Sequence, residues 1–186
     1  MNILGIIASS KFGDVGDFES IATTTVGSGG AANVEFTSIP STYSHLQVRI
    51  TSLSDVNTAS GGANINLQFN SDTGSNYAWH ELYGTGASAA AGAGTSQTFI
   101  KTGYTADSTT GYTGASIIDI LDYANTNKYK TVRALTGSDI NGSGGYILLR
   151  SGVWMNTNAV TSLKLTNQSG NLKQYSHFAL YGIRSA

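Results

Sequence analysis

Apolar and polar residues alternate with a period of two in several short runs along this chain. The clearest runs are HLQVRI at 45–50, NINLQF at 64–69 and SLKL at 162–165. This alternation is typical of β-strands that bury one face and leave the other in solvent. No stretch keeps the 3.6-residue period of an amphipathic helix for three turns, so the pattern predicts an all-β chain.

Segments rich in glycine, serine and asparagine separate these runs at the spacing seen in β-sandwiches and barrels. The chain has 23 glycines and one proline, Pro40, in 186 residues. We expect about nine to eleven strands in a single-domain antiparallel β-sandwich, jelly-roll-like, over residues 18–186. An extended N-terminal arm over residues 1–17 precedes this domain. The glycine-rich segments at 84–96 and 105–114 are expected to be exposed loops, the first of them flexible.

The stretch IIDILDYANTNKYKTVRAL, at 117–135, predicts a β-hairpin. Ile118 and Ile120 fall on one face of its first strand, and the pattern restarts at TVRAL. The segment ANTNK between them suits a turn, because asparagine tolerates left-handed backbone and hydrogen-bonds its own main chain. Asp119 alternates with apolar neighbours, and Arg133 on the returning strand is its expected cross-strand partner. We therefore interpret these charged residues as pairing and turn groups rather than as a reactive cluster.

The low charge of the chain limits its partners. Charged residues make up 11% of the sequence, and the formal net charge is −1. Nucleic-acid binding needs a basic face and an anionic membrane surface attracts a polybasic patch, so neither partner is expected. The absence of cysteine excludes a thiolate zinc site and a cysteine nucleophile. The apolar run at 3–8 is much shorter than the roughly 20 residues of a membrane span, and no basic segment of a signal peptide precedes it.

Catalytic and metal-binding patterns are weak, so the sequence predicts no enzyme, no cofactor and no metal site. The spacing of histidines and carboxylates selects neither a Ser-His-Asp triad nor the paired acids of a glycosidase. The residues considered for these classes are His45, His80, His177, Glu35, Glu81, Asp119 and Asp122. The segment NSDTGSNY at 70–77 faintly resembles a calcium loop, but Ser75 stands where such a loop needs glycine. We expect a polar hairpin turn there.

Aromatic residues support one alternative function, the binding of a saccharide. Aromatic side chains among asparagine and serine can stack on a sugar ring while polar neighbours hydrogen-bond its hydroxyls. Trp79, Tyr83 and Trp154 are the candidate contacts for a host glycan. The same residue types are common in cores and subunit interfaces, so both interpretations stay open.

A set of segments spread over nearly the whole chain carries a family resemblance. They are ILGIIASS, SIATTTVGSGGAANVEFTSIPSTYSHLQVRI, LQFNSDTGSNYAWHELYG, GTSQTFI, IIDILDYANTNKYKTVRALTG, SGVWMNTNAVTSLKL and QYSHFALYGI. In this order they resemble a family of virion structural proteins of tailed phages, including phages of cyanobacteria and other aquatic bacteria. Members of that family are labelled as tail-fibre, receptor-binding or head-decoration proteins. The resemblance implies a virion component and supplies no catalytic residues.

Among these classes, one compact domain with a short arm and no fibrous shaft favours head decoration. We expect a homotrimer on the outer surface of the capsid that clamps the lattice of the major capsid protein or contacts other virion proteins. Docking contacts are expected from the arm, at Ile3, Leu4, Ile6, Ile7 and Phe12. Subunit contacts are expected from the last strand, whose two faces are both apolar, at Phe178, Leu180, Tyr181 and Ile183. The alternative is a tail-fibre or spike head domain that binds a host surface glycan.

Overall fold

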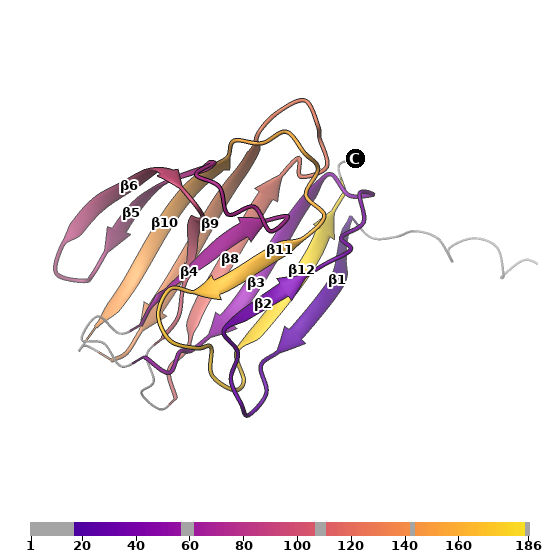
Figure 1. Cartoon of the computed structure of the whole chain (residues 1–186). Coiled ribbons are helices and arrows are strands. Elements are labelled where there is room, and N and C mark those ends of the chain that lie inside the picture. Colours follow the sequence, from indigo (N-terminus) through magenta and orange to yellow (C-terminus); the bar gives the residue numbers. More distant parts are fainter. Residues whose placement is uncertain (1–16, 57–61, 107–110, 142–143, 185–186) are drawn as a thin grey trace, which may run out of the picture.

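The computed structural model describes residues 17–56, 62–106, 111–141 and 144–184, and these contain β-strands without any helix (Figure 1). One sheet has eight strands, in the order β1 (Phe18–Thr25), β12 (His177–Ile183), β3 (His45–Ser52), β8 (Gly114–Leu121), β9 (Lys130–Asp139), β10 (Gly145–Trp154), β5 (Tyr77–Gly84) and β6 (Ala89–Gln97). The other has four strands, in the order β2 (Asn33–Phe36), β11 (Leu163–Asn167), β4 (Asn64–Phe69) and β7 (Ile100–Tyr104).

The prediction of an all-β, antiparallel fold is confirmed, and the two layers are consistent with a β-sandwich. Neighbouring strands in both sheets are antiparallel. The strands of the described residues number twelve, slightly more than expected. The small sheet lies across the large one, and β5 and β6 extend past it at the left of the view (Figure 1).

The predicted alternation corresponds to the buried faces of the strands. Residues 46, 48 and 50 of β3 and residues 65, 67 and 69 of β4 point into the space between the sheets and are buried. An aromatic cluster fills one end of this core, where the ring of Trp154 lies 5.3 Å from that of Phe69 and 6.3 Å from that of Tyr77. Burial of these side chains is the main source of stability in such a fold.

The predicted hairpin at 117–135 is confirmed as strands β8 and β9. Asp119 pairs with Arg133 in the register, and Arg133 Nη2 lies 2.8 Å from Asp119 Oδ2. The carboxylate also accepts a hydrogen bond from Gln47 Nε2 at 2.8 Å. In the turn, the left-handed residue is Asp122, with φ of 49°, and not one of the asparagines. The side chain of Lys128 donates to Asp122, so these charges stabilise the turn.

A buried lysine anchors the same turn. Lys130 is 0% exposed, and its Nζ donates to the backbone oxygens of Asn125, Lys128 and Thr157 at 2.5, 2.9 and 3.0 Å. Burial lowers the pKa of Lys130, and the nearby charge of Lys128 lowers it further. Three acceptors nevertheless require three N–H donors, which only the ammonium form carries. Lys130 therefore ties the β8–β9 turn to the segment that follows β10.

The expectation of a flexible loop at 84–96 is wrong, because residues 89–97 form strand β6 at the edge of the large sheet. The strand pairs with β5, and Gly94 lies opposite Trp79. A Cβ atom on Gly94 would lie 2.7 Å from Trp79 Cε2, so glycine leaves room for the indole ring. At 105–114, Thr105 and Ala106 are buried rather than exposed, and residues 107–110 lie outside the described part.

The polar segment at 70–76 connects the two sheets, so the prediction of a hairpin turn is wrong there. It leads from β4 in the small sheet to β5 in the large one. Asp72 accepts hydrogen bonds from Trp154 Nε1 at 2.7 Å, from the backbone of Gly74 at 2.8 Å and from Asn76 Nδ2 at 3.0 Å. Burial opposes ionisation of Asp72, but these bonds outweigh it and lower the pKa of the carboxyl group. Asp72 thus holds the connection against the core.

Candidate functional site

The face of the large sheet that points away from the small sheet, here called the outer face, carries a row of aliphatic side chains. The strand register aligns Ile117 of β8 with Leu135 of β9, Leu135 with Leu149 of β10, and Leu149 with Leu82 of β5. Directly paired residues on one face of a sheet hold their Cβ atoms about 5 Å apart. These four residues, here called the apolar row, therefore form one continuous band across four adjacent strands.

The apolar row is open to solvent in the single chain. Its members are between 43% and 57% exposed, and Ile147 on the same face is 64% exposed. Single exposed leucines are common on protein surfaces. A contiguous group of large aliphatic side chains instead marks a surface that binds another molecule. A shallow depression of about 340 Å³ lies over part of the row, between Asp119, Arg133 and the side chains of Ile117, Leu135 and Leu149.

Polar and aromatic groups border the apolar row. The Asp119–Arg133 pair lies on one side of it, in the next pair of positions along β8 and β9. Arg49 on β3 is paired with Ile117, and its guanidinium lies 4.9 Å from the ring of Phe18 and 5.4 Å from that of Tyr181. The result is an apolar centre with a polar rim, which is the usual composition of a protein–protein contact surface.

No profile of a known protein family matches the chain, and no curated protein matches it.

The structure separates the three aromatic residues predicted to contact a glycan. Trp154 is 1% exposed in the core, and its Nε1 is bound to Asp72. Trp79 is 7% exposed, and Lys101 Nζ lies 4.2 Å from the centre of its ring. Tyr83 is half-buried and lines a groove on the opposite, inner face of the large sheet. Only Tyr83 among them offers surface to a ligand in this conformation.

The predicted subunit-contact residues occupy two different environments. Phe178 and Leu180 are 0% exposed and belong to the hydrophobic core. Tyr181 and Ile183 are half-buried, and Tyr181 stacks on Phe18 with 4.7 Å between ring centres. Part of the apolar surface of this strand is thus covered within the chain. The arm residues Ile3, Leu4, Ile6, Ile7 and Phe12 lie outside the described residues.

Two of the three histidines considered for catalysis form hydrogen bonds within the fold. His45 Nδ1 accepts a hydrogen bond from the backbone of Asp122 at 3.0 Å, and His177 Nδ1 lies 2.9 Å from Thr25 Oγ1. His80 is exposed on β5, away from both. In the ranges that the structure describes, no three histidine or acidic side chains gather closely enough to hold a metal ion. Nor does any helix there have the length and apolar content to cross a membrane.

The sequence pattern indicates an outward position for two of the four residues of the apolar row. The alternation in IIDILD places Ile117 outward, and that in TVRAL places Leu135 outward. Leu82 and Leu149 gave no such signal, because their strands contain apolar, aromatic and charged residues without a simple alternation. Which strands are neighbours, and hence that the four side chains align, follows only from the sheet order.

Proposed function

We propose that this chain is a structural subunit of a tailed-phage particle, where a homotrimer decorates the outer surface of the capsid and clamps the lattice of the major capsid protein. The observation that carries the proposal is the exposed apolar row on the outer face. The largest apolar patch of a soluble monomer is typically roughly 300–600 Å² and is often functional. A subunit that packs this face against a neighbouring copy removes the row from water.

The finer features belong to the same proposal. The two-layered domain is a jelly-roll-like sandwich, and residues 1–17 form an extended arm. The arm residues Ile3, Leu4, Ile6, Ile7 and Phe12 dock on the major capsid protein, while the outer face, with Tyr181 at its margin, contacts neighbouring copies. Many copies of such contacts, each weak, add up over a shell through multivalency.

Size-exclusion chromatography with light scattering tests the assembly. We expect a trimer for the unmodified chain and a monomer with an unchanged circular-dichroism spectrum for Leu135→Asp. Thr37→Asp, an exposed change beside β2, is the matched control and leaves the trimer intact. A chain that stays monomeric at high concentration, or a Leu135→Asp variant that remains trimeric, contradicts the assembly through this face.

Gold-labelled antibodies on intact particles test the location. Antibody label spread over the whole phage head at many copies agrees with capsid decoration. Deletion of residues 1–12 should then abolish attachment to the capsid while the trimer still folds. Undiminished attachment after the deletion would remove the docking role of the arm. Label confined to the tail favours the alternative, a tail-fibre or spike head domain.

A further inference from the structure

A groove opens on the inner face of the large sheet, where β5 and β6 extend past the small sheet (Figure 1). Its volume is about 350 Å³. The side chains that matter for its chemistry are Asn64, Glu81, Tyr83, Tyr104, Tyr146 and Arg150. Small-molecule sites start at about 300 Å³, so the groove has room for a compact ligand.

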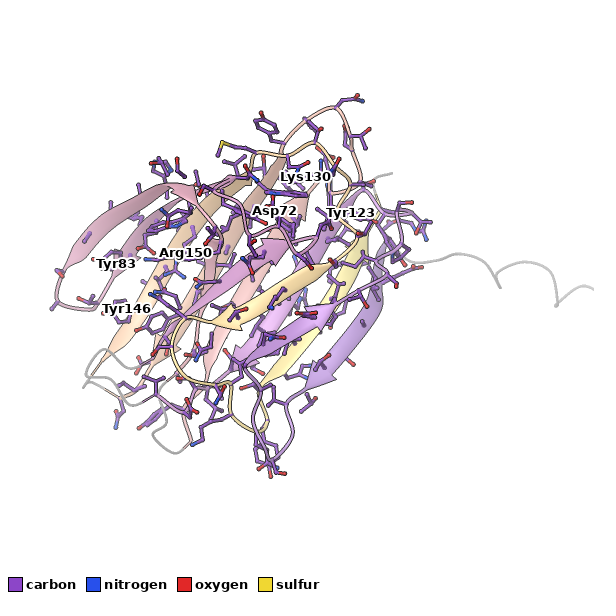
Figure 2. The ribbon with its side chains drawn as sticks, in the orientation of Figure 1. Asp72, Tyr83, Tyr123, Lys130, Tyr146 and Arg150 are labelled. Atoms are coloured by element: carbon purple, nitrogen blue, oxygen red, sulfur yellow. The ribbon has the colours of Figure 1, made fainter. Side chains whose placement is uncertain are left out.

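Tyrosine rings form one wall of the groove. The ring centre of Tyr146 lies 5.0 Å from that of Tyr104 and 6.1 Å from that of Tyr83, at interplanar angles of 44° and 50°. The hydroxyl group of buried Tyr104 donates to the carbonyl oxygen of Gly62 at 3.2 Å, which fixes this ring. Tyr83 and Tyr146 are only half-buried and keep ring surface for a ligand. They lie on the same side of the molecule as Arg150 (Figure 2).

Charged and amide side chains, bound to one another, form the polar part of the lining. Arg150 is 3% exposed, and its Nε and Nη2 lie 2.9 and 2.8 Å from Glu81 Oε2. Its other donors bind the carbonyl oxygen of Gly103 at 2.7 Å and Asn64 Oδ1 at 2.5 Å. The guanidinium group is therefore held on several sides. Glu81 is shared between Arg150 and Lys101, whose Nζ lies 3.8 Å from Glu81 Oε1. A buried arginine without such partners would be strongly unfavourable.

The pairing of Arg150 decides which ligand class fits. Phosphate or carboxylate ligands need a positive charge that is free to bind them. Arg150, the cation that lines the groove, is already bound to Glu81, and Lys101 does not line the groove. A purely apolar ligand would remove water from the remaining acceptor positions of the Glu81 carboxylate without replacing its hydrogen bonds. A sugar ring fits both the tyrosine wall and the polar lining. Its C–H face packs on an aromatic ring, and its hydroxyls donate to carboxylate and amide oxygens.

We propose that this groove binds a neutral saccharide. Tyr83 and Tyr146 pack on the sugar ring. Glu81 Oε1, which Arg150 does not bind and which lies 3.8 Å from Lys101 Nζ, accepts a hydrogen bond from a sugar hydroxyl. Arg150 holds Glu81 and Asn64 in place and acts as a positioning residue. The proposal is independent of the particle and of the trimer, because the groove lies on the opposite face of the large sheet from the apolar row.

Saturation-transfer NMR on the full chain tests the groove with glucose, galactose, mannose and N-acetylglucosamine, and with glucuronate as the charged competitor. We expect at least one neutral sugar to bind with a dissociation constant of about a millimolar. Tyr83→Ala and Tyr146→Ala should each weaken binding about 10-fold, since they remove the stacking face. The control Tyr175→Ala, at a tyrosine that is 74% exposed and outside the groove, should leave binding unchanged.

A second measurement uses the unmodified protein, so it tests the groove even if an alanine substitution prevents folding. Titration of the labelled protein with the bound sugar should shift the backbone amide signals of residues 81, 83, 146 and 150, which line the groove. It should leave those of residues 117, 119 and 121, whose side chains point to the outer face, unchanged. The proposal is overturned if none of the neutral sugars binds, if glucuronate binds more tightly than they do, or if the shifts occur elsewhere.

Discussion

Replacing Lys130 with methionine probes the buried ammonium group that anchors the β8–β9 turn. The change keeps a long, unbranched side chain but removes the three hydrogen bonds to Asn125, Lys128 and Thr157. Each backbone oxygen left without a partner costs about 1 kcal/mol or more, so the loss is about 3 kcal/mol. Methionine has no charge to desolvate, which keeps the estimate at the lower end of the range for broken buried charge networks.

Urea unfolding followed by circular dichroism measures this loss. For a domain of this size, about 3 kcal/mol corresponds to a melting temperature lower by about 6–12 °C. The matched control is Lys128→Met two residues earlier, where a side chain that is 54% exposed loses only its contact with Asp122. That change should cost less than about 1 kcal/mol. Equal losses for the two variants, or a Lys130→Met variant as stable as the unmodified chain, would refute the assignment of an anchoring role to Lys130.

Three further changes test the packing and the charges of the core. Burial raises the pKa of Tyr77 to about 12. In the unfolded chain the same hydroxyl ionises near pH 10. The contribution of Tyr77 to the free energy of unfolding is therefore complete below that pH and falls by about 2–3 kcal/mol towards pH 12. Tyr77→Phe should show a smaller fall, because Tyr43 and Tyr123, whose pKa values are also raised, still contribute to it. Urea titrations at pH 9 to 12 measure the difference, and an equal fall in both proteins contradicts the prediction. The pKa of Asp72 is lowered, so its stabilising effect is present above about pH 4 and disappears as the pH falls through the folded-state value. Asp72→Asn should reduce this loss of stability at low pH, measured as the melting temperature against pH. An unchanged loss contradicts the role given to the carboxylate. Gly94→Ala forces a methyl group against Trp79 and should cost about 1–3 kcal/mol, while Gly137→Ala, where no atom lies within 4 Å of the added Cβ, should stabilise the strand by about 0.5 kcal/mol. Similar melting temperatures for these two variants would disprove the close contact.

Apolar alternation was sufficient to predict the strands with one clearly buried face. It placed the β8–β9 hairpin correctly, including the pairing of Asp119 with Arg133. The same alternation puts Lys130 on the face of Val132 and Ala134 in KTVRA, and Lys130 is buried with them. A charged side chain is rarely fully buried, so residue type alone gives no indication of this position.

Other parts could not be read from the sequence for physical reasons. Strand β6 consists largely of alanine and glycine, so no side-chain pattern marks it, and its backbone bonds to β5 define it. Alternation tells which face of a strand is buried but not which sheet it joins, which is why the 70–76 connection was misassigned. The groove needs Tyr83, Tyr104 and Tyr146 from three different strands or their ends, and only the folded topology brings them together.

The position of β12 has a consequence for how the chain reaches its folded state. This strand is made after the other eleven, yet it separates β1 from β3 in the large sheet. Until it is in place, β1 has no neighbour to bond and β3 presents a bare edge. Sheet closure therefore waits for a pairing between the two ends of the domain, and such long-range pairing is slow. A premature stop before residue 177 leaves those backbone groups free to bond to other chains, so the shortened product should aggregate more readily than the whole one.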